Sequence, residues 1–390
     1  MNIHEGTLGS TQVVANDLPE KWIDFRQDLP HQKGDLSKRN WGHPWHSICS
    51  YQGKLKPSIA HTLIDALLPE SGGVMLDPFS GVGTIPFEAR LKGHRAFAFD
   101  ISPTAIAISR SKLEHIKVEQ LLKELHHLGT WIKENKLPTQ SYDFSGIRFN
   151  GPLEDYFHPE TFSEIISARE YFLRFGFSDP TRAMVMSCLL HILHGNRPYA
   201  LSRRSHPITP FAPTGEAIQH SLIEKLETKL RRVLKSTVGE SHQSKVYNQD
   251  AAGLWPDDVD ELDAIITSPP FFDSTRFYSA NWMRLWFSGW DAKDFSTKPA
   301  DFVEVKQKID FSVYEPIFSQ AAKRLKSGGY FALHLGKSLK CDMAKMIMDV
   351  GKKHLTVVDF FDESVLHCES HGIRDKGSVT DHQYVLFRQK

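Results

Sequence analysis

The chain has 390 residues, which is enough for one large domain or two moderate ones. Its apolar content of 40% and charged content of 24% are ordinary for a globular protein, and no stretch approaches the roughly 20 apolar residues of a membrane span. The 47 basic and 47 acidic residues cancel, which excludes a protein that is basic throughout but leaves room for a local basic surface.

Four widely separated cysteines form no CxxC pair: Cys49, Cys188, Cys341 and Cys368. They favour neither a disulfide framework nor a zinc site, and they fit a reducing compartment. The first residues show no basic-then-apolar signal pattern. We therefore expect a cytoplasmic protein without a membrane anchor or a bound metal.

Residues 1–40 form a polar N-terminal arm with a run of mixed charge. Trp22, Ile23 and Phe25 within it favour packing on the rest of the molecule. Contact with DNA and partial mobility both remain open as alternatives.

The chain is organised around the stretch Gly73–Thr84. Its apolar run Val74–Leu76 predicts a buried strand, Ser80–Gly83 is a loop of small residues, and a helix begins at Thr84. This order presents backbone N–H groups and a helix N-terminus to a ligand. A second strand follows and ends at Asp100, where a carboxylate is placed to accept hydrogen bonds from ribose hydroxyls.

Helices and strands alternate through the remainder of the chain. The expected helices cover 102–128, 160–175, 181–194, 216–236, 277–290, 313–326 and 339–351. One expected strand ends near residue 250, and the others cover 262–267, 330–335, 355–361 and 383–387. This alternation predicts an α/β fold with a mostly parallel twisted sheet and helices on both faces. Few strand signals occur between 111 and 244, so this stretch is expected to be a mainly helical insertion.

The insertion carries positive charge. Between residues 197 and 249 there are nine Lys or Arg and four Asp or Glu, a net charge of +5. Interleaved cations and aromatic rings suit phosphate contact and base stacking, although a solvated helix face is the alternative. The candidate nucleic-acid contacts are Arg197, Arg203, Arg204, Arg231 and Arg232. His191 and His194 have no third ligand near them in sequence, which argues against a metal.

Two motifs carry a family resemblance. Asp77-Pro-Phe-Ser-Gly-Val-Gly-Thr84 resembles the S-adenosylmethionine-binding motif of the amino-methyltransferases that modify DNA bases, and Asp263–Phe271 resembles their catalytic motif. The serine form, Ser268-Pro269-Pro270-Phe271, is typical of the N4-cytosine enzymes, whereas the adenine-N6 enzymes usually begin it with Asp. The resemblance implies a Rossmann-like class I methyltransferase fold.

Within that fold, residues 41–110 and 245–390 would form the catalytic domain, and the insertion 111–244 would recognise the target. The resemblance implies that S-adenosylmethionine binds to Tyr51, Lys54, Pro57, Asp77, Pro78, Phe79, Ser80, Gly81, Gly83, Thr84, Asp100, Ile101 and Asp250. Both motifs would have to meet at one place in the molecule.

The catalytic motif suits methylation of an exocyclic amine. The sulfonium of the cofactor already activates the methyl group, so the protein must align the groups and free the amine lone pair from the ring. The Ser268 hydroxyl and the Pro269 carbonyl are candidate acceptors for the amine hydrogens. Pro270 would stiffen the turn, and Phe271 would stack on the base.

The resemblance implies a site-specific DNA methyltransferase that acts on the N4 amine of a cytosine flipped out of double-stranded DNA. A cognate restriction endonuclease and association with the nucleoid would accompany it. An adenine-N6 DNA enzyme and an RNA base methyltransferase of the same fold are the alternatives. A nucleotide-binding dehydrogenase is disfavoured, because the loop lacks the third spaced glycine of such enzymes. A DNA-binding protein that retains the fold but is catalytically silent stays open.

Overall fold

The computed structural model describes residues 18–136, 138, 146–147, 149–239, 244–273, 277–365 and 379–390. The first 17 residues of the predicted arm and Cys368 lie outside this part of the chain. No helix in the described ranges has the length and apolar character that crossing a membrane requires.

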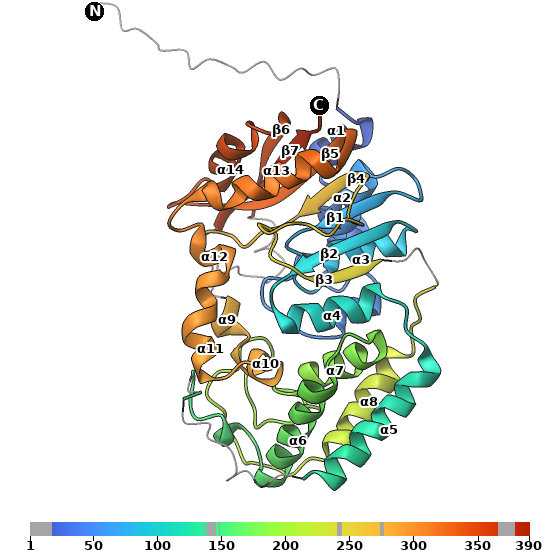
Figure 1. Cartoon of the computed structure of the whole chain (residues 1–390), viewed down its shortest axis with the longest axis vertical. Coiled ribbons are helices and arrows are strands. Elements are labelled where there is room, and N and C mark those ends of the chain that lie inside the picture. The colour runs from blue at the N-terminus through green and yellow to red at the C-terminus, as the bar shows by residue number, and fades with distance from the viewer. Residues whose placement is uncertain are drawn as a thin grey trace, which may run out of the picture.

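The described residues form a seven-stranded sheet with the order β3-β2-β1-β4-β5-β7-β6 (Figure 1). Its strands are β1 (Val74–Asp77), β2 (Arg95–Asp100), β3 (Lys245–Asn248), β4 (Leu262–Thr267), β5 (Leu325–Ser338), β6 (Thr356–Ser364) and β7 (Val379–Arg388). Neighbours from β3 to β5 are parallel, and β7 is antiparallel to both β5 and β6. The predicted Rossmann-like class I methyltransferase fold is confirmed.

Alternate residues of the strands face opposite sides of the sheet, as the period of two requires. Met75, Ala264 and Ile266 pack with α1 (Glu20–Asp28), α2 (Pro57–Leu67) and α3 (Thr84–Leu91) on one face. Leu76, Ile265 and Leu333 pack with α13 (Glu315–Arg324) and α14 (Met343–Gly351) on the other. The sheet is therefore covered on both faces, and only its ends are left for a ligand.

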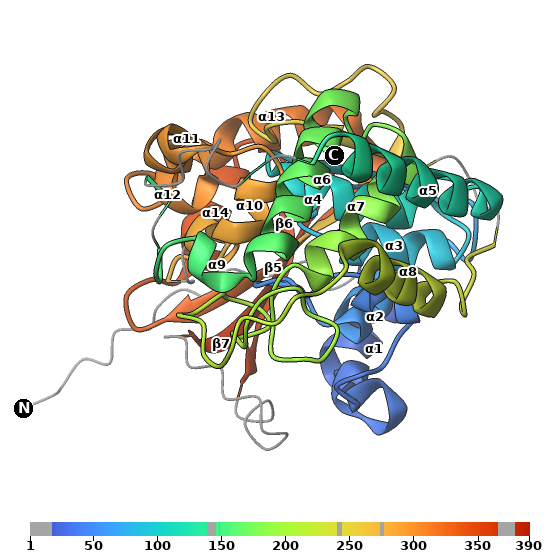
Figure 2. The same cartoon turned by 90° about the horizontal axis from the view of Figure 1, so that it is seen from below.

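The helices between β2 and β3 lie below the sheet in Figure 1, on the side away from α13 and α14, and Figure 2 views the molecule from that end. They are α4 (Pro103–Leu113), α5 (Val118–Glu134), α6 (Pro159–Phe175), α7 (Pro180–Ile192) and α8 (Leu222–Val233). One apolar cluster joins them through residues such as Leu128, Ile165 and Leu189. The insertion is mainly helical, as the sequence predicts.

Several element boundaries differ from the sequence-based expectation. The helix predicted over 102–128 is two helices, because the Glu114 carboxylate turns to accept hydrogen bonds from Val246 N–H (3.1 Å) and Arg110 Nε (3.2 Å). The helix predicted from 216 begins at Leu222, where the Ser221 side chain caps it. The aromatic helix is split at Asn281. Short elements there and beyond are α9 (Phe277–Ala280), α10 (Trp282–Phe287), α11 (Ala292–Thr297) and α12 (Val303–Lys306).

The described part of the N-terminal arm packs on the sheet end formed by β6 and β7. Trp22 Nε1–H donates to Asp359 Oδ2 at 2.8 Å, and His31 Nε2 lies 2.8 Å from Glu363 Oε1. The Tyr384 hydroxyl donates to the second oxygen of Glu363 at 2.6 Å. Burial opposes ionisation of Glu363, but the hydrogen bonds from His31 and Tyr384 outweigh it and lower the pKa to about 2.

This depressed pKa predicts a pH-dependent contribution to stability. The ionised Glu363 stabilises the fold above its ordinary pKa of 4.5, and the contribution is lost as pH falls from there toward 2. We expect Glu363→Gln to lower the free energy of unfolding by up to about 3 kcal/mol at pH 5, and by much less at pH 3. Urea denaturation at both pH values measures this. Glu216→Gln, at an exposed carboxylate, is the control, and an equal loss for Glu363→Gln at both pH values would contradict the assignment.

Candidate active site at the carboxyl edge of the sheet

The two motifs leave the sheet side by side. Strands β1 and β4 are parallel neighbours, with Leu76 paired to Ile265. The Thr267 hydroxyl donates to Asp77 Oδ1 at 2.6 Å, and Phe79 N–H donates to the same oxygen at 3.1 Å. The glycine loop and the Ser268–Phe271 segment therefore start from one hydrogen-bonded point, at the edge formed by the carboxyl ends of β1 to β5.

The glycine loop is fixed by Asp100. Gly81 N–H donates to Asp100 Oδ2 at 2.9 Å, and Ser102 N–H donates to Oδ1 at 2.8 Å. Gly81 has a φ of 50°, and a Cβ added there would meet no atom within 4 Å. The loop thus keeps an open side next to a carboxylate, and each carboxylate oxygen retains a lone pair for a ligand hydroxyl.

The neighbouring residues complete the loop. Ser80 donates from both its N–H and its hydroxyl to the Phe99 carbonyl at 3.0 Å, and Gly83 is the N-cap of α3. Thr84 Oγ1 is buried, and it has no hydrogen-bond partner among the described residues. Buried Pro78 precedes Phe79, whose ring lies 6.1 Å from that of Tyr314.

Both carboxyl groups at this edge titrate near neutrality. Burial raises the pKa of Asp100 to about 7 against the hydrogen bonds from Ser102 and Gly81. Burial likewise raises the pKa of Asp77 to about 7 against the hydrogen bond from Thr267. Carboxyl acceptors, an unpaired hydroxyl at a helix N-terminus and an open glycine loop fit the ribose and the methionine moiety of S-adenosylmethionine.

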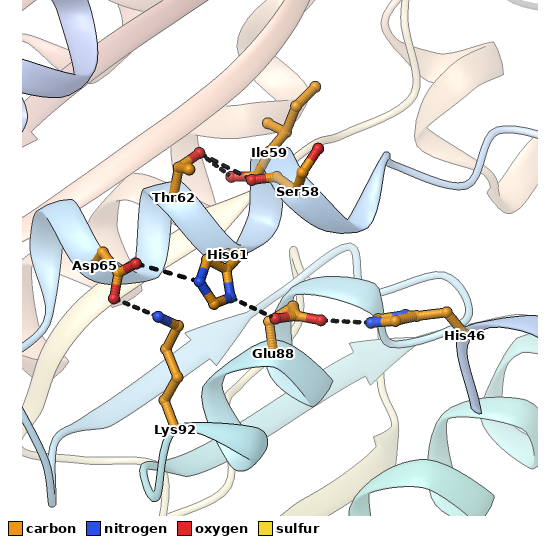
Figure 3. A network of polar contacts seen from close by, with 8 residues as sticks. All are labelled: His46, Ser58, Ile59, His61, Thr62, Asp65, Glu88 and Lys92. Atoms are coloured by element: carbon orange, nitrogen blue, oxygen red, sulfur yellow. Dashed lines mark hydrogen bonds and ion pairs between the residues drawn. The ribbon is translucent and has the colours of Figure 1, made fainter. Parts of the chain in front are cut away.

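A polar network holds the segment before α2 against α3 (Figure 3). Glu88 on α3 accepts from His46 at 2.6 Å and from His61 at 2.9 Å, and His61 and Lys92 both contact Asp65. Burial opposes ionisation of Glu88, but these hydrogen bonds outweigh it and lower its pKa. The network anchors the helix that begins at the glycine loop.

Three predicted cofactor residues lie in the segment that this network anchors. Lys54 Nζ donates to the His46 carbonyl at 2.7 Å, and Pro57 is the first residue of α2. Buried Tyr51 has its ring 5.1 Å from that of Phe277. Burial, and then the charge of Asp100, raise the pKa of the Tyr51 hydroxyl well above its ordinary value.

Ile101 and Asp250 flank the same edge. Ile101 packs on the apolar cluster of Trp290 and Phe302. Asp250 follows β3, accepts from Ala252 N–H at 2.9 Å and lies 3.5 Å from Lys306 Nζ. Both are near the end of β2, since Gln249 N–H donates to the Asp100 carbonyl at 3.0 Å.

The Ser268–Phe271 segment is held from the side by residues that no motif marks. Ser268 Oγ lies 3.0 Å from His334 Nδ1, and Gln307 Nε2 donates to the Pro270 carbonyl at 2.9 Å. The Phe271 ring lies over Gly336, where an added Cβ would be 2.4 Å from Phe271 Cδ2. His334 and Gly336 come from β5, so the strand next to β4 shapes this segment.

The predicted nucleic-acid contacts differ in what they touch. Arg203 donates to the carbonyls of Gly215 (2.8 Å) and Asp155 (3.0 Å), and Arg231 pairs with Glu227 at 2.6 Å. These two side chains already have partners within the fold. Arg197, Arg204, Arg231 and Arg232 are exposed, and Arg203 is half-buried.

Arg232 lies beside the segment that precedes α2. Its guanidinium is 5.7 Å from the centre of the Tyr199 ring, and the Tyr199 hydroxyl is 3.1 Å from His191 Nε2. His191 Nδ1 accepts from Ser50 N–H at 3.3 Å, one residue from Tyr51. Among the described residues no group of three or more His, Cys, Asp or Glu side chains is arranged to hold a metal.

Comparison with known proteins finds relatives for the cofactor half of the site. Residues 44–128 match the model of the family described as "RMKL-like, methyltransferase domain". The chain is 29% identical over 108 residues to the tRNA (guanine(10)-N2)-dimethyltransferase of Methanothermobacter thermautotrophicus, which covers 25% of this chain and 32% of that protein. It thus spans about a third of the length of this relative.

Solved structures with a coarse likeness include TrmN from Thermus thermophilus, at 13% identity, a TM-score of 0.33, and coverage of 87% of this chain and 50% of that one. Another is the rRNA methyltransferase aviRa from Streptomyces viridochromogenes, at 10% identity, a TM-score of 0.30, and coverage of 86% and 85%. S-adenosylmethionine is the cofactor of this site, and the domain is a methyltransferase domain.

The predicted membership in the DNA N4-cytosine methyltransferases is wrong, because the matched relative is a tRNA guanine-N2 enzyme and the matched domain is RMKL-like. Three further predictions depended on that membership and are not supported: a flipped cytosine in double-stranded DNA, a restriction endonuclease partner and association with the nucleoid. The physical reason lies in the catalytic motif. The chemistry expected of it, which is oxygen acceptors for an exocyclic amine conjugated to a ring, applies to guanine N2 as much as to cytosine N4, so the motif does not specify the polymer.

We predict that Asp100→Asn weakens S-adenosylmethionine binding by about 10- to 100-fold at pH 8, because an amide nitrogen would face either a backbone N–H or the ligand hydroxyl. In the unaltered protein, affinity should fall between pH 8 and pH 6 as Asp100 takes up a proton near pH 7. Isothermal titration calorimetry measures both effects. Asp257→Asn, at a fully exposed carboxylate, is the control, and unchanged affinity of Asp100→Asn would refute the placement of the cofactor.

We predict that Gly336→Ala lowers kcat by about tenfold or more while S-adenosylmethionine affinity stays constant. The added methyl would displace the Phe271 ring, and a small misplacement of an aligning group is costly in methyl transfer. Gly239→Ala, at an exposed position without a positive φ where an added Cβ would meet no atom within 4 Å, is the control. Equal kcat for both variants would show that the Phe271 position is unimportant.

Proposed function

We propose that this protein transfers a methyl group from S-adenosylmethionine to the N2 amine of a guanine in RNA, with tRNA as the first substrate class to examine. The observation on which the proposal depends is the hydrogen bond between Asp77 and Thr267, which joins the cofactor loop to the Ser268–Phe271 segment. The guanine-N2 activity for which the Methanothermobacter thermautotrophicus relative is named supports guanine N2 as the acceptor.

The chemistry of guanine N2 suits the residues present. The cofactor supplies a methyl group activated by the sulfonium charge. The guanine amine has its lone pair delocalised into the ring, so acceptors for its hydrogens must favour a pyramidal nitrogen. Ser268 Oγ and the Pro269 carbonyl are the acceptors that we assign to this role, and Phe271 is assigned to stack on the base.

The insertion 111–244 is the region that we propose to contact the RNA. RNA is read mainly through single-stranded bases stacked on aromatic or guanidinium planes, together with phosphate contacts. The exposed Arg232 and the half-buried Tyr199 ring beside it offer both kinds of surface, and Tyr199 is linked through His191 to Ser50 beside the cofactor segment. Arg197 and Arg204 add exposed positive charge.

The proposal predicts methyl transfer to RNA but not to DNA. Purified protein should transfer radiolabelled methyl groups to unmodified tRNA, and nucleoside digestion should return the label as N2-methylguanosine or N2,N2-dimethylguanosine. Asp100→Asn is the variant control, since it weakens cofactor binding and should lower the transfer at a limiting cofactor concentration. Label in N4-methylcytosine or N6-methyladenine, or transfer to duplex DNA alone, would refute the proposal.

A further inference from the structure

His334 is a buried histidine, and the stability of the fold does not explain why a histidine stands at this position. Its side chain is 2% exposed, and Nε2 has no hydrogen-bond partner among the described residues. A buried polar atom without a partner costs about 1–3 kcal/mol, a cost that an apolar side chain would avoid. A feature of this kind needs a reason in function.

The other ring nitrogen of His334 points at the catalytic motif. Nδ1 lies 3.0 Å from Ser268 Oγ. Because Thr267 pairs with Leu333 across β4 and β5, His334 is held one residue further along the strand, beside Ser268. The rings of Phe271, His382 and Tyr384 surround the imidazole at centroid distances of 5.5, 4.7 and 5.2 Å.

The ring is neutral at pH 7. Burial, followed by the charges of His382 and His31, lowers the pKa of His334 well below its ordinary value, and Glu363 only partly opposes this. In a neutral imidazole one nitrogen carries the hydrogen and the other accepts. The tautomer of His334 therefore decides which way the hydrogen of the Ser268 hydroxyl points.

The two tautomers have opposite consequences for methyl transfer. If Nδ1 carried the hydrogen, it would donate to Ser268 Oγ, and the hydroxyl hydrogen of Ser268 would turn toward the substrate and compete for the amine lone pair. If Nδ1 is bare, it accepts the hydroxyl hydrogen, and the lone pairs of Ser268 Oγ face the amine hydrogens. The first arrangement leaves Ser268 Oγ one lone pair for the amine hydrogens, whereas the second leaves both and keeps the hydroxyl hydrogen away from the substrate.

We propose that His334 is a positioning residue that accepts the Ser268 hydroxyl hydrogen on Nδ1 and so orients Ser268 as an acceptor for the amine. The inference rests on the proposed function, because it assigns the serine to amine recognition. In this proposal His334, which lies on β5 and does not touch the substrate, determines whether the Ser268 hydroxyl donates or accepts a hydrogen bond at the substrate.

The tautomer can be measured without any nucleic acid. Long-range ¹H–¹⁵N NMR of the full chain labelled at histidine should show His334 with Nε2 protonated and Nδ1 bare, with the signals assigned by their loss in His334→Asn. Ser268→Ala should shift the Nδ1 resonance. A protonated Nδ1 would overturn the proposal whatever the substrate is.

A kinetic cycle tests the role in transfer. His334→Leu should lower kcat on tRNA by about tenfold or more with little change in KM, and His334→Asn, which can present an acceptor oxygen, should recover most of it. In the Ser268→Ala background, His334→Leu should cause no further loss, since it acts through the serine. Independent losses from the two substitutions would overturn the proposal.

A protein that methylates no RNA would refute the proposed function, while the NMR result would still decide the state of His334.

Discussion

The hydrogen bond between the Thr267 hydroxyl and the Asp77 carboxylate is the contact on which the site depends. It joins the ends of two neighbouring parallel strands that are 190 residues apart in the chain. Strands β1 and β4 lie near the centre of the sheet, where helices cover both faces and hold the strand ends rigidly. The glycine loop leaves from one strand end and the Ser268–Phe271 segment from the other, so the fold itself fixes how these two segments lie relative to each other.

The residues around this contact divide into two groups of different origin. The cofactor side is local: Gly81, Asp100 and Ser102 lie within 22 positions of one another and bond through backbone N–H groups. The acceptor side is assembled from distant parts of the chain, since Gln307 supports Pro270, and His334 and Gly336 support Ser268 and Phe271. The glycine loop after β1 thus keeps an open side, while separate elements support the Ser268–Phe271 segment.

This division explains what the sequence could predict. The strand, glycine loop and acid form a contiguous pattern, and the fold and the cofactor follow from it. His334, Gln307 and Gly336 could not be predicted, because each acts through a contact across the sheet and stands in no motif. The helix expected over 102–128 breaks at Glu114 because that carboxylate bonds to β3, again a contact between segments distant in sequence. The substrate was predicted wrongly because the Ser268–Phe271 pattern does not distinguish DNA from RNA.

The structure of the protein with bound S-adenosylhomocysteine tests the central claim most directly. The account predicts that the ribose hydroxyls donate to Asp100, that the ligand passes over Gly81, and that the sulfur faces Ser268 and Pro269. A ligand bound away from Gly81, or a sulfur directed away from Ser268, would contradict the claim that one edge of the sheet holds both the methyl donor and the acceptors for the amine.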